Sequence, residues 1–140
     1  NLENHVTEVL NQNDFLPAAC QGVVGGQAHK KNNYGDLFSK LNHIKTQTEC
    51  LAERNILRII NANCNSPVSV VSKIINNEIE IKVQLLNHFG ESMFFKMYRD
   101  LKSNYKQLSK IIGKEIISEV GKTTIEQLNN LENDFDYTPA

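Results

Sequence analysis

Cysteine, arginine and long apolar runs are scarce in this chain of 140 residues. The three cysteines, Cys20, Cys50 and Cys64, lie far apart, and neither a Cys-x-x-Cys pair nor a Cys/His cluster occurs. We therefore expect no structural zinc or other metal site and no disulfide framework. Free thiols are typical of a reducing compartment, so we expect a cytoplasmic protein.

No apolar run has the roughly 20 residues needed to cross a bilayer, and Asn1–Leu10 lacks the pattern of a signal peptide. The formal net charge of −1 gives no basic footprint for nucleic acid or an anionic membrane. Neither partner is expected. A hydrophobic content of 40% with 22% charged residues is typical of a globular protein that has a core.

The composition is biased toward the residues that codons rich in A and T encode. The chain has 13 Ile, 18 Asn and 12 Lys but only 3 Arg, which favours an AT-rich, bacterial genome. It begins at Asn1 without an initiator Met, in a stretch whose Leu2, Val6, Val9 and Leu10 share one helical face. We expect a piece of a longer protein.

Residues 42–140 have the pattern of an α+β domain. The run 79–85 alternates strictly between apolar and polar residues, as a strand buried on one face does. Asn76-Asn77 before it suits a tight hairpin turn, because Asn tolerates positive φ. We expect a C-terminal three-stranded antiparallel sheet covered on one face by helices. The predicted strands are 68–75, 79–87 and 93–98, and the predicted helices are 46–60, 103–120 and 123–131.

Residues 1–41 have the pattern of an incomplete α/β domain. We expect a helix end within 1–14 and an extended, glycine-containing segment over Phe15–Gln27. A short amphipathic helix is expected over Tyr34–Leu41, with its apolar side chains directed inward: Leu37, Phe38 and Leu41.

The loop 61–67, Asn-Ala-Asn-Cys-Asn-Ser-Pro, places Cys64 between a predicted helix and a predicted strand. Its small, polar and turn-forming residues indicate a surface loop. A thiol there can reach an electrophile that a buried thiol cannot. The alternative is an inert loop thiol, since most cysteines act as small hydrophobes.

Four blocks in order resemble the porphobilinogen deaminase (hydroxymethylbilane synthase) family. They are Leu-Pro-Ala-Ala-Cys-Gln-Gly at 16–22, Leu-Asn-His at 41–43 with Thr46, Ala-Glu-Arg at 52–54, and Asn-Cys-Asn-Ser-Pro at 63–67. The order and spacing are more specific than any single block. The resemblance covers nearly the whole chain and is to the C-terminal part of the family.

This resemblance implies a fold and a function. Residues 1–41 correspond to the end of domain two and the returning strand and helix of domain one, and 42–140 to the cofactor-attachment domain. The family joins four porphobilinogen units into hydroxymethylbilane, releasing ammonia, in haem biosynthesis. Its dipyrromethane cofactor is held by a thioether, here on Cys64, and Gln21 and Gly22 match the segment that contacts it. The family's catalytic aspartate and substrate-binding arginines match no residue of this chain. The family usually works as a monomer.

Three positions depart from the family's pattern. Asn63 stands where glycine usually precedes the loop cysteine, and we expect its tolerance of positive φ to keep the turn. Cys20 replaces the glycine expected before Gln21. Gly26-Gln27 stands where an apolar residue and a glutamate are common. These changes affect the expected geometry of the returning strand.

Other readings of these residues stay open. Gln21 and Gly22 could form a simple turn, and Arg54 a surface ion pair instead of a contact in the cleft. Cys50 is expected in core packing and Cys20 in a structural role. We interpret His43 as a structural hydrogen-bonding residue. As a whole, the chain could instead be a small α+β binding or regulatory module that uses its sheet face for a protein partner.

Overall fold

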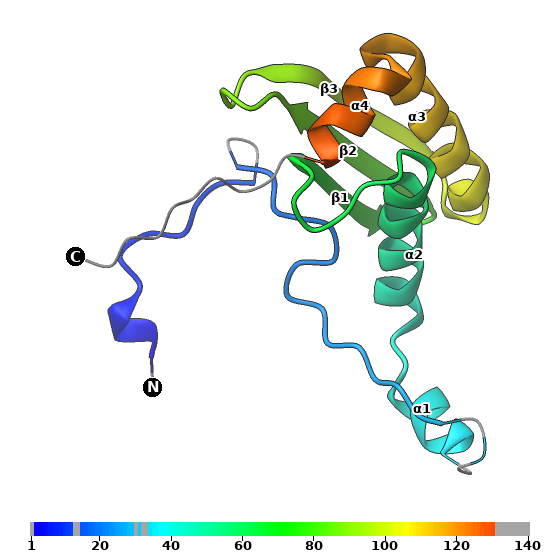
Figure 1. Cartoon of the computed structure of the whole chain (residues 1–140). Coiled ribbons are helices and arrows are strands. Elements are labelled where there is room, and N and C mark those ends of the chain that lie inside the picture. Colours follow the sequence, from blue (N-terminus) through cyan, green and yellow to red (C-terminus); the bar gives the residue numbers. More distant parts are fainter. Residues whose placement is uncertain (1, 13–14, 30, 32–33, 131–140) are drawn as a thin grey trace.

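The computed structural model describes residues 2–12, 15–29, 31 and 34–130. Residues 44–130 form a layered α+β unit. The described residues ahead of it form a long segment that passes beside this unit at residues 16–20 and then leads away from it (Figure 1). This segment carries the short helix α1 (Gly35–Leu41), far from the sheet. Within the described residues ahead of α1, the one helical element is a 3-10 turn, η1 (Glu3–His5).

The sheet contains β1 (Val68–Ile75), β2 (Glu78–Leu86) and β3 (Ser92–Leu101), in that order and all antiparallel. The predicted three-stranded sheet is confirmed. The alternating residues of β2 give it one buried face, as the pattern indicated. The buried side chains of that strand are Ile79, Ile81, Val83 and Leu85.

Asparagine shapes both turns of the sheet. Asn76 has a φ of +56°, so the expected tolerance of positive φ is used in the β1–β2 turn. Between β2 and β3, the Asn87 side-chain oxygen accepts hydrogen bonds of 2.9 Å from the backbone nitrogens of Phe89 and Glu91. Gly90 completes this turn with a φ of +82°. Residues within each turn therefore determine its conformation.

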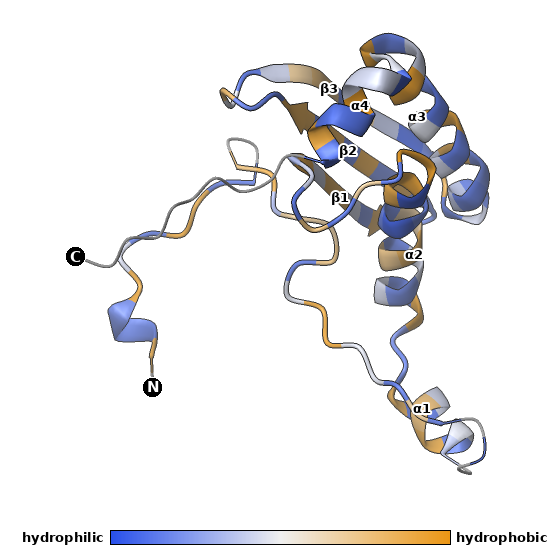
Figure 2. Cartoon of the chain, in the orientation of Figure 1, coloured by the Kyte–Doolittle hydropathy of each residue, from blue (hydrophilic) through white to orange (hydrophobic). Residues whose placement is uncertain are grey.

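Helices cover one face of the sheet (Figure 1). They are α2 (Ile44–Ile59), α3 (Tyr105–Val120), which follows the 3-10 turn η2 (Lys102–Asn104), and α4 (Lys122–Asn129). In Figure 2 the helices alternate between hydrophobic and hydrophilic colours, since only one side of each meets the core. The most deeply buried core side chains are Ala52, Ile56, Val70, Ile79, Ile81, Val83, Ile112 and Ile116.

The contact between α2 and α3 depends on a small residue. A Cβ atom built on Gly113 of α3 would lie 2.6 Å from Cγ2 of Ile59 on α2. Nearby, the buried Ser109 hydroxyl donates to the carbonyl of Ala52 at 3.1 Å and to that of Tyr105 at 2.7 Å. Glycine and serine thus let the two backbones approach closely.

Residues 2–29 differ from the expectations. The described part of 1–14 holds only η1, and its apolar side chains are exposed, because an isolated amphipathic stretch without a packing partner does not sustain a helix. Described residues of 15–27 form turns and irregular chain instead of a strand, since a strand needs a neighbour to pair with.

Two expectations about buried side chains are also wrong. On α1, Leu37 and Leu41 are exposed because none of the elements that the structure describes packs against that face, while Phe38 is half-buried. Its ring lies against Gly26, where a Cβ would be 2.3 Å from the Phe38 ring. Within the described ranges, no helix combines the length and apolarity needed to cross a membrane.

Candidate functional site

Cys64 lies on the surface, in the loop that joins α2 to β1. The loop leaves α2 through Asn61, which has a φ of +52°. The Ala62 nitrogen donates to the carbonyl of Leu57 at 2.9 Å, which closes the end of the helix. The predicted surface position of this thiol is confirmed.

The side chain of Asn63 organises the turn that presents Cys64. Its oxygen accepts a hydrogen bond of 2.8 Å from the backbone nitrogen of Asn65, and its own backbone nitrogen donates to the Ser66 hydroxyl at 2.8 Å. The Ser66 nitrogen donates back to the Asn63 carbonyl at 3.2 Å. Cys64 is therefore held inside a turn whose two ends are bonded to each other.

The same turn is fastened to α4 by Asn129, a buried residue 66 positions away from Asn63. The carbonyl of Asn129 accepts from the Asn63 amide at 2.7 Å, and its side-chain oxygen accepts from the Ser66 hydroxyl at 2.6 Å. Its amide nitrogen donates to the carbonyls of Ile60 and Asn61 at 2.9 and 3.0 Å. These four hydrogen bonds satisfy the side-chain amide and the carbonyl of Asn129, which is buried.

The expectation that Asn63 supplies the positive φ of a glycine is wrong. Positive φ occurs two residues earlier, at Asn61, and Asn63 is not in that conformation. Asn63 acts instead through its side chain, which forms an Asx turn and reaches α4. Sequence reasoning missed Asn129 altogether, because no local pattern signals a partner so distant in the chain.

A second turn presents Gln21 and Gly22. The Gln21 nitrogen donates to the Ala18 carbonyl at 3.1 Å, and the Val23 nitrogen to the Cys20 carbonyl at 3.2 Å. Cys20 has a φ of +59° and Gly22 one of +78°. A left-handed conformation at Cys20 explains why glycine suits this position better. Gln21 and Gly22 are both exposed.

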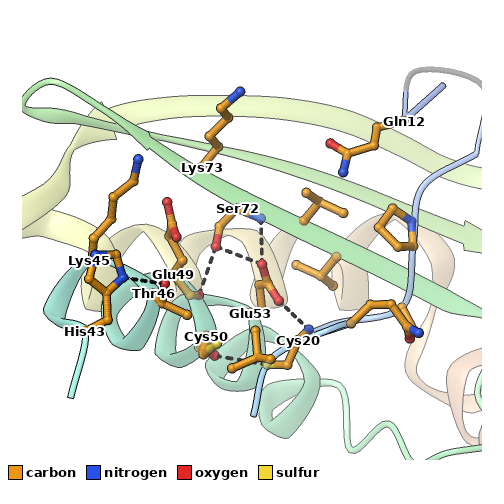
Figure 3. A pocket seen from close by; sticks show the side chains of 16 residues that line it. Gln12, Cys20, His43, Lys45, Thr46, Glu49, Cys50, Glu53, Ser72 and Lys73 are labelled. Atoms are coloured by element: carbon orange, nitrogen blue, oxygen red, sulfur yellow. Dashed lines mark hydrogen bonds between the residues drawn. The ribbon is translucent and has the colours of Figure 1, made fainter. Parts of the chain in front are cut away.

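A buried carboxylate, Glu53 of α2, ties this turn to the sheet (Figure 3). One of its oxygens accepts from the Cys20 backbone nitrogen at 2.6 Å. The other accepts from the backbone nitrogen of Ser72 at 2.7 Å and from its hydroxyl at 2.9 Å. Glu53 thus joins three segments of the chain, a role that the sequence reading did not assign.

Glu49, one turn earlier on α2, extends this arrangement along β1. Its carboxylate accepts from the backbone nitrogen of Ile74 at 2.6 Å, and its carbonyl accepts from the Ser72 hydroxyl at 2.9 Å. β1 is an edge strand, so these backbone nitrogens have no neighbouring strand to bond. Carboxylates of α2 therefore occupy the open edge of the sheet.

A hollow of about 450 Å³ lies between the turn at 18–21, α2 and β1 (Figure 3). Cys20, Gln21, Cys50 and Glu53 are among its lining residues, and Cys64 is not. Burial, followed by the Cys50 thiol and the Glu53 carboxylate, raises the pKa of the Cys20 thiol to about 12. A second hollow of about 790 Å³ lies between residues 23–26 and helices α1 and α2, and Cys50 lines it as well.

Of the remaining residues singled out from the sequence, Cys50 and His43 line both hollows and Arg54 lines neither. Cys50 is half-buried at both hollows, so the expectation of core packing is wrong. The ring of His43 shares a hydrogen bond of 2.8 Å with the Thr46 hydroxyl, which confirms its hydrogen-bonding role. Arg54 is exposed and forms no ion pair with any residue that the structure describes. Within the described ranges, no group of three or more His, Cys, Asp or Glu side chains lies close enough together to hold a metal ion.

Comparison with known proteins decides the family. A family profile described as porphobilinogen deaminase, C-terminal domain, matches residues 47–121, which is more than half of the chain. The chain belongs to the porphobilinogen deaminase family. The matched range includes α2 from residue 47 onward, the Cys64 loop, the whole sheet and α3, and it begins after Gln21.

Relatives from two clostridia match a larger share of the chain than the family profile does. The porphobilinogen deaminase of Clostridium acetobutylicum is 27% identical over 122 residues, covering 85% of this chain and 40% of that protein. The Clostridium kluyveri protein of the same name is 28% identical over 113 residues, covering 81% and 38%. A probable porphobilinogen deaminase of Saccharolobus islandicus is 37% identical over 65 residues, covering 46% and 22%. The chain thus spans at most about 40% of the length of these relatives.

Proposed function

We propose that this chain is the cofactor-carrying part of a porphobilinogen deaminase and that Cys64 holds dipyrromethane through a thioether. The observation that supports the proposal is the exposed Cys64 thiol on a turn fixed by Asn63, Ser66 and Asn129. A residue that holds a cofactor covalently must be accessible to the cofactor, and its loop must have a fixed position. The whole enzyme would join four porphobilinogen units into hydroxymethylbilane and release ammonia.

A cysteine thiol is chemically suited to hold dipyrromethane. A thiolate is a soft nucleophile, and its attack on a pyrrole-methylene carbon gives a stable carbon–sulfur bond. Cys20 and Cys50 suit this role less well, because both are partly buried, and the Cys20 thiol has a raised pKa. When bound, the dipyrromethane supplies the primer to which pyrrole units are added.

Gln21 and Gly22 are proposed to contact the cofactor from the second turn. Both are exposed, and the turn is fixed to α2 through the bond between Glu53 and the Cys20 nitrogen. The chemistry of ring joining would come from an aspartate, and substrate carboxylates would be bound by arginines. We assign neither role to a residue of this chain. We further propose a cytoplasmic, monomeric enzyme.

One observation favours the alternative, a module that binds a protein partner through its sheet. The face of β3 away from the helices exposes Met93, Phe95 and Met97 by 40%, 54% and 58%. Exposed apolar side chains that gather on one face are typical of contact surfaces. The two functions make different predictions for the mass of the protein.

The intact mass of the full-length gene product, made in cells that synthesise porphobilinogen, tests the proposal. We expect a mass above that of the sequence by one dipyrromethane. Cys64→Ala should remove the excess, whereas the matched variant Cys50→Ala should keep it. The bare sequence mass in every form would favour the binding module.

A further inference from the structure

Cys20 and Cys50 come from segments 30 residues apart and lie together at the hollow between the 18–21 turn and α2 (Figure 3). The sulfur of Cys20 is 3.8 Å from the backbone oxygen of Cys50. The Cys20 backbone is fixed there as well, since its nitrogen lies 2.6 Å from the carboxylate of Glu53. Glu53 follows Cys50 by three positions, so both project from the same side of α2.

We propose that Cys20 and Cys50 form a reversible disulfide by exchange with a small disulfide of the glutathione type. Both thiols are free and partly exposed in the structure. A disulfide needs sulfur atoms about 2.05 Å apart and Cβ atoms about 3.5–4.5 Å apart. Both side chains border a hollow, which leaves room for the rotation that this geometry requires.

The exchange takes two steps. The Cys50 thiolate attacks one sulfur of the glutathione disulfide, which forms a mixed disulfide and releases one glutathione thiolate. The Cys20 thiolate then attacks the Cys50 sulfur and releases the second glutathione. Two protein thiols lose their protons and two electrons, and the glutathione disulfide is reduced to two glutathione thiols.

Cys50 is the first nucleophile for two reasons. It lines both hollows, so a reagent reaches it from two sides. The raised pKa of Cys20 keeps that thiol protonated at neutral pH. Burial is the largest cause of the raised pKa of Cys20, and the charge of Cys50 adds to it; the mixed disulfide removes the second contribution only. The first step therefore favours the second.

The disulfide would fix the turn that carries Gln21 onto the helix that leads to the Cys64 loop. This consequence does not depend on what Cys64 binds. Oxidation would restrict the movement of residues 18–22 relative to α2 and narrow the hollow that both cysteines line.

Peptide mapping tests the pairing, because trypsin separates the three cysteines. Cleavage after Lys and Arg places Cys20 in peptide 1–30, Cys50 in 46–54 and Cys64 in 59–73. The folded chain, carrying Cys64→Ser to prevent shuffling, is equilibrated with mixtures of reduced and oxidised glutathione and then alkylated. We expect a linked 1–30/46–54 product that carries no alkyl group, and an intact mass about 2 Da below that of the reduced, unalkylated protein.

Two further samples make the result decisive. Cys20→Ser should stop at a mixed disulfide of Cys50, whereas Cys50→Ser should react far more slowly, at least about tenfold by the thiolate argument. In the chain with all three cysteines, the 1–30/46–54 link should dominate. Links to peptide 59–73 in equal yield, or formation of the 1–30/46–54 link only after denaturation, would overturn the proposal.

Discussion

The carboxylate of Glu53 accepts a hydrogen bond of 2.6 Å from the backbone nitrogen of Cys20, 33 residues earlier in the chain. Its other oxygen bonds Ser72 on the edge strand β1. A single buried side chain therefore joins the turn with Gln21 to the edge of the sheet.

Glu53→Gln should reduce the free energy of unfolding by about 1–3 kcal/mol, because an amide group leaves one buried donor facing another. Chemical denaturation measures this. Arg54→Gln is the matched control, since Arg54 is the exposed neighbour on α2, and it should change stability by less than about 0.5 kcal/mol. Equal stability of the Glu53→Gln variant and the unmodified chain would show that this carboxylate does not hold the turn.

Asn129→Ala should loosen the Cys64 loop. It removes three side-chain hydrogen bonds and leaves the carbonyls of Ile60 and Asn61 without their donor, at a cost of about 1–3 kcal/mol. Hydrogen exchange of residues 61–66 should accelerate. Asn130→Ala, at the exposed next position, should leave the loop protected. Unchanged exchange in the Asn129 variant would mean that the loop is ordered by its own turn alone.

Gly113→Ala should destabilise the domain although alanine is the better helix former. The added Cβ would meet Ile59 at 2.6 Å, so the two helices must move apart, at a cost of about 1–3 kcal/mol. Gly35→Ala is the control, because its Cβ would meet nothing within 4 Å. A rise in melting temperature for Gly113→Ala would contradict the close contact of α2 and α3.

Replacing Cys20 separates backbone strain from thiol chemistry. Cys20→Gly and Cys20→Ala both remove the sulfur, but only glycine adopts a φ of +59° without strain. The glycine variant should therefore be the more stable of the two by about 1 kcal/mol. If the Cys20→Ala variant proves as stable as the Cys20→Gly variant in urea denaturation, the left-handed conformation at residue 20 does not reduce the free energy of unfolding.

Cys20 should also make stability depend on alkaline pH. Its pKa is raised in the folded state from an ordinary 9.0 to about 12. The folded state then binds more protons than the unfolded state between these values, so stability falls as pH rises above about 9. Cys20→Ala should flatten this part of the stability profile. Identical profiles from pH 8 to 11 would show that the thiol does not contribute.

Local patterns predicted the sheet and its helices well. The alternation over 79–85 and the turn at Asn76-Asn77 depend on neighbouring residues, and both agree with the structure. The exposure of Cys64 was predictable for the same reason, from the turn-forming residues around it.

Features that depend on distant partners could not be predicted in this way. The apolar face of residues 2–10 indicated a helix, but nothing described packs against it, and only the 3-10 turn η1 forms there. Glu53 and Asn129 are ordinary polar residues in their helices, and their importance comes from contacts 19 to 69 residues away. The cofactor role of Cys64 came from a family resemblance and stays a prediction.

The chain of 140 residues should not assemble tetrapyrrole by itself. The matched relative from Clostridium acetobutylicum is about twice as long as this chain, and neither the acid/base aspartate nor the carboxylate-binding arginines have been assigned in it. Incubation with porphobilinogen, followed by assay for hydroxymethylbilane, checks this. Turnover by the isolated chain would show that the chemistry resides in residues described above.

Localising a pyrrole on the chain tests the central proposal most directly. The full-length gene product from porphobilinogen-producing cells is digested with trypsin, and the peptides are treated with p-dimethylaminobenzaldehyde, which colours pyrroles. Colour and the added mass of a dipyrromethane should follow peptide 59–73, which contains Cys64. A bare 59–73 peptide, or colour on 46–54 or on the peptide that contains Cys20, would contradict the assignment of Cys64 as the tether.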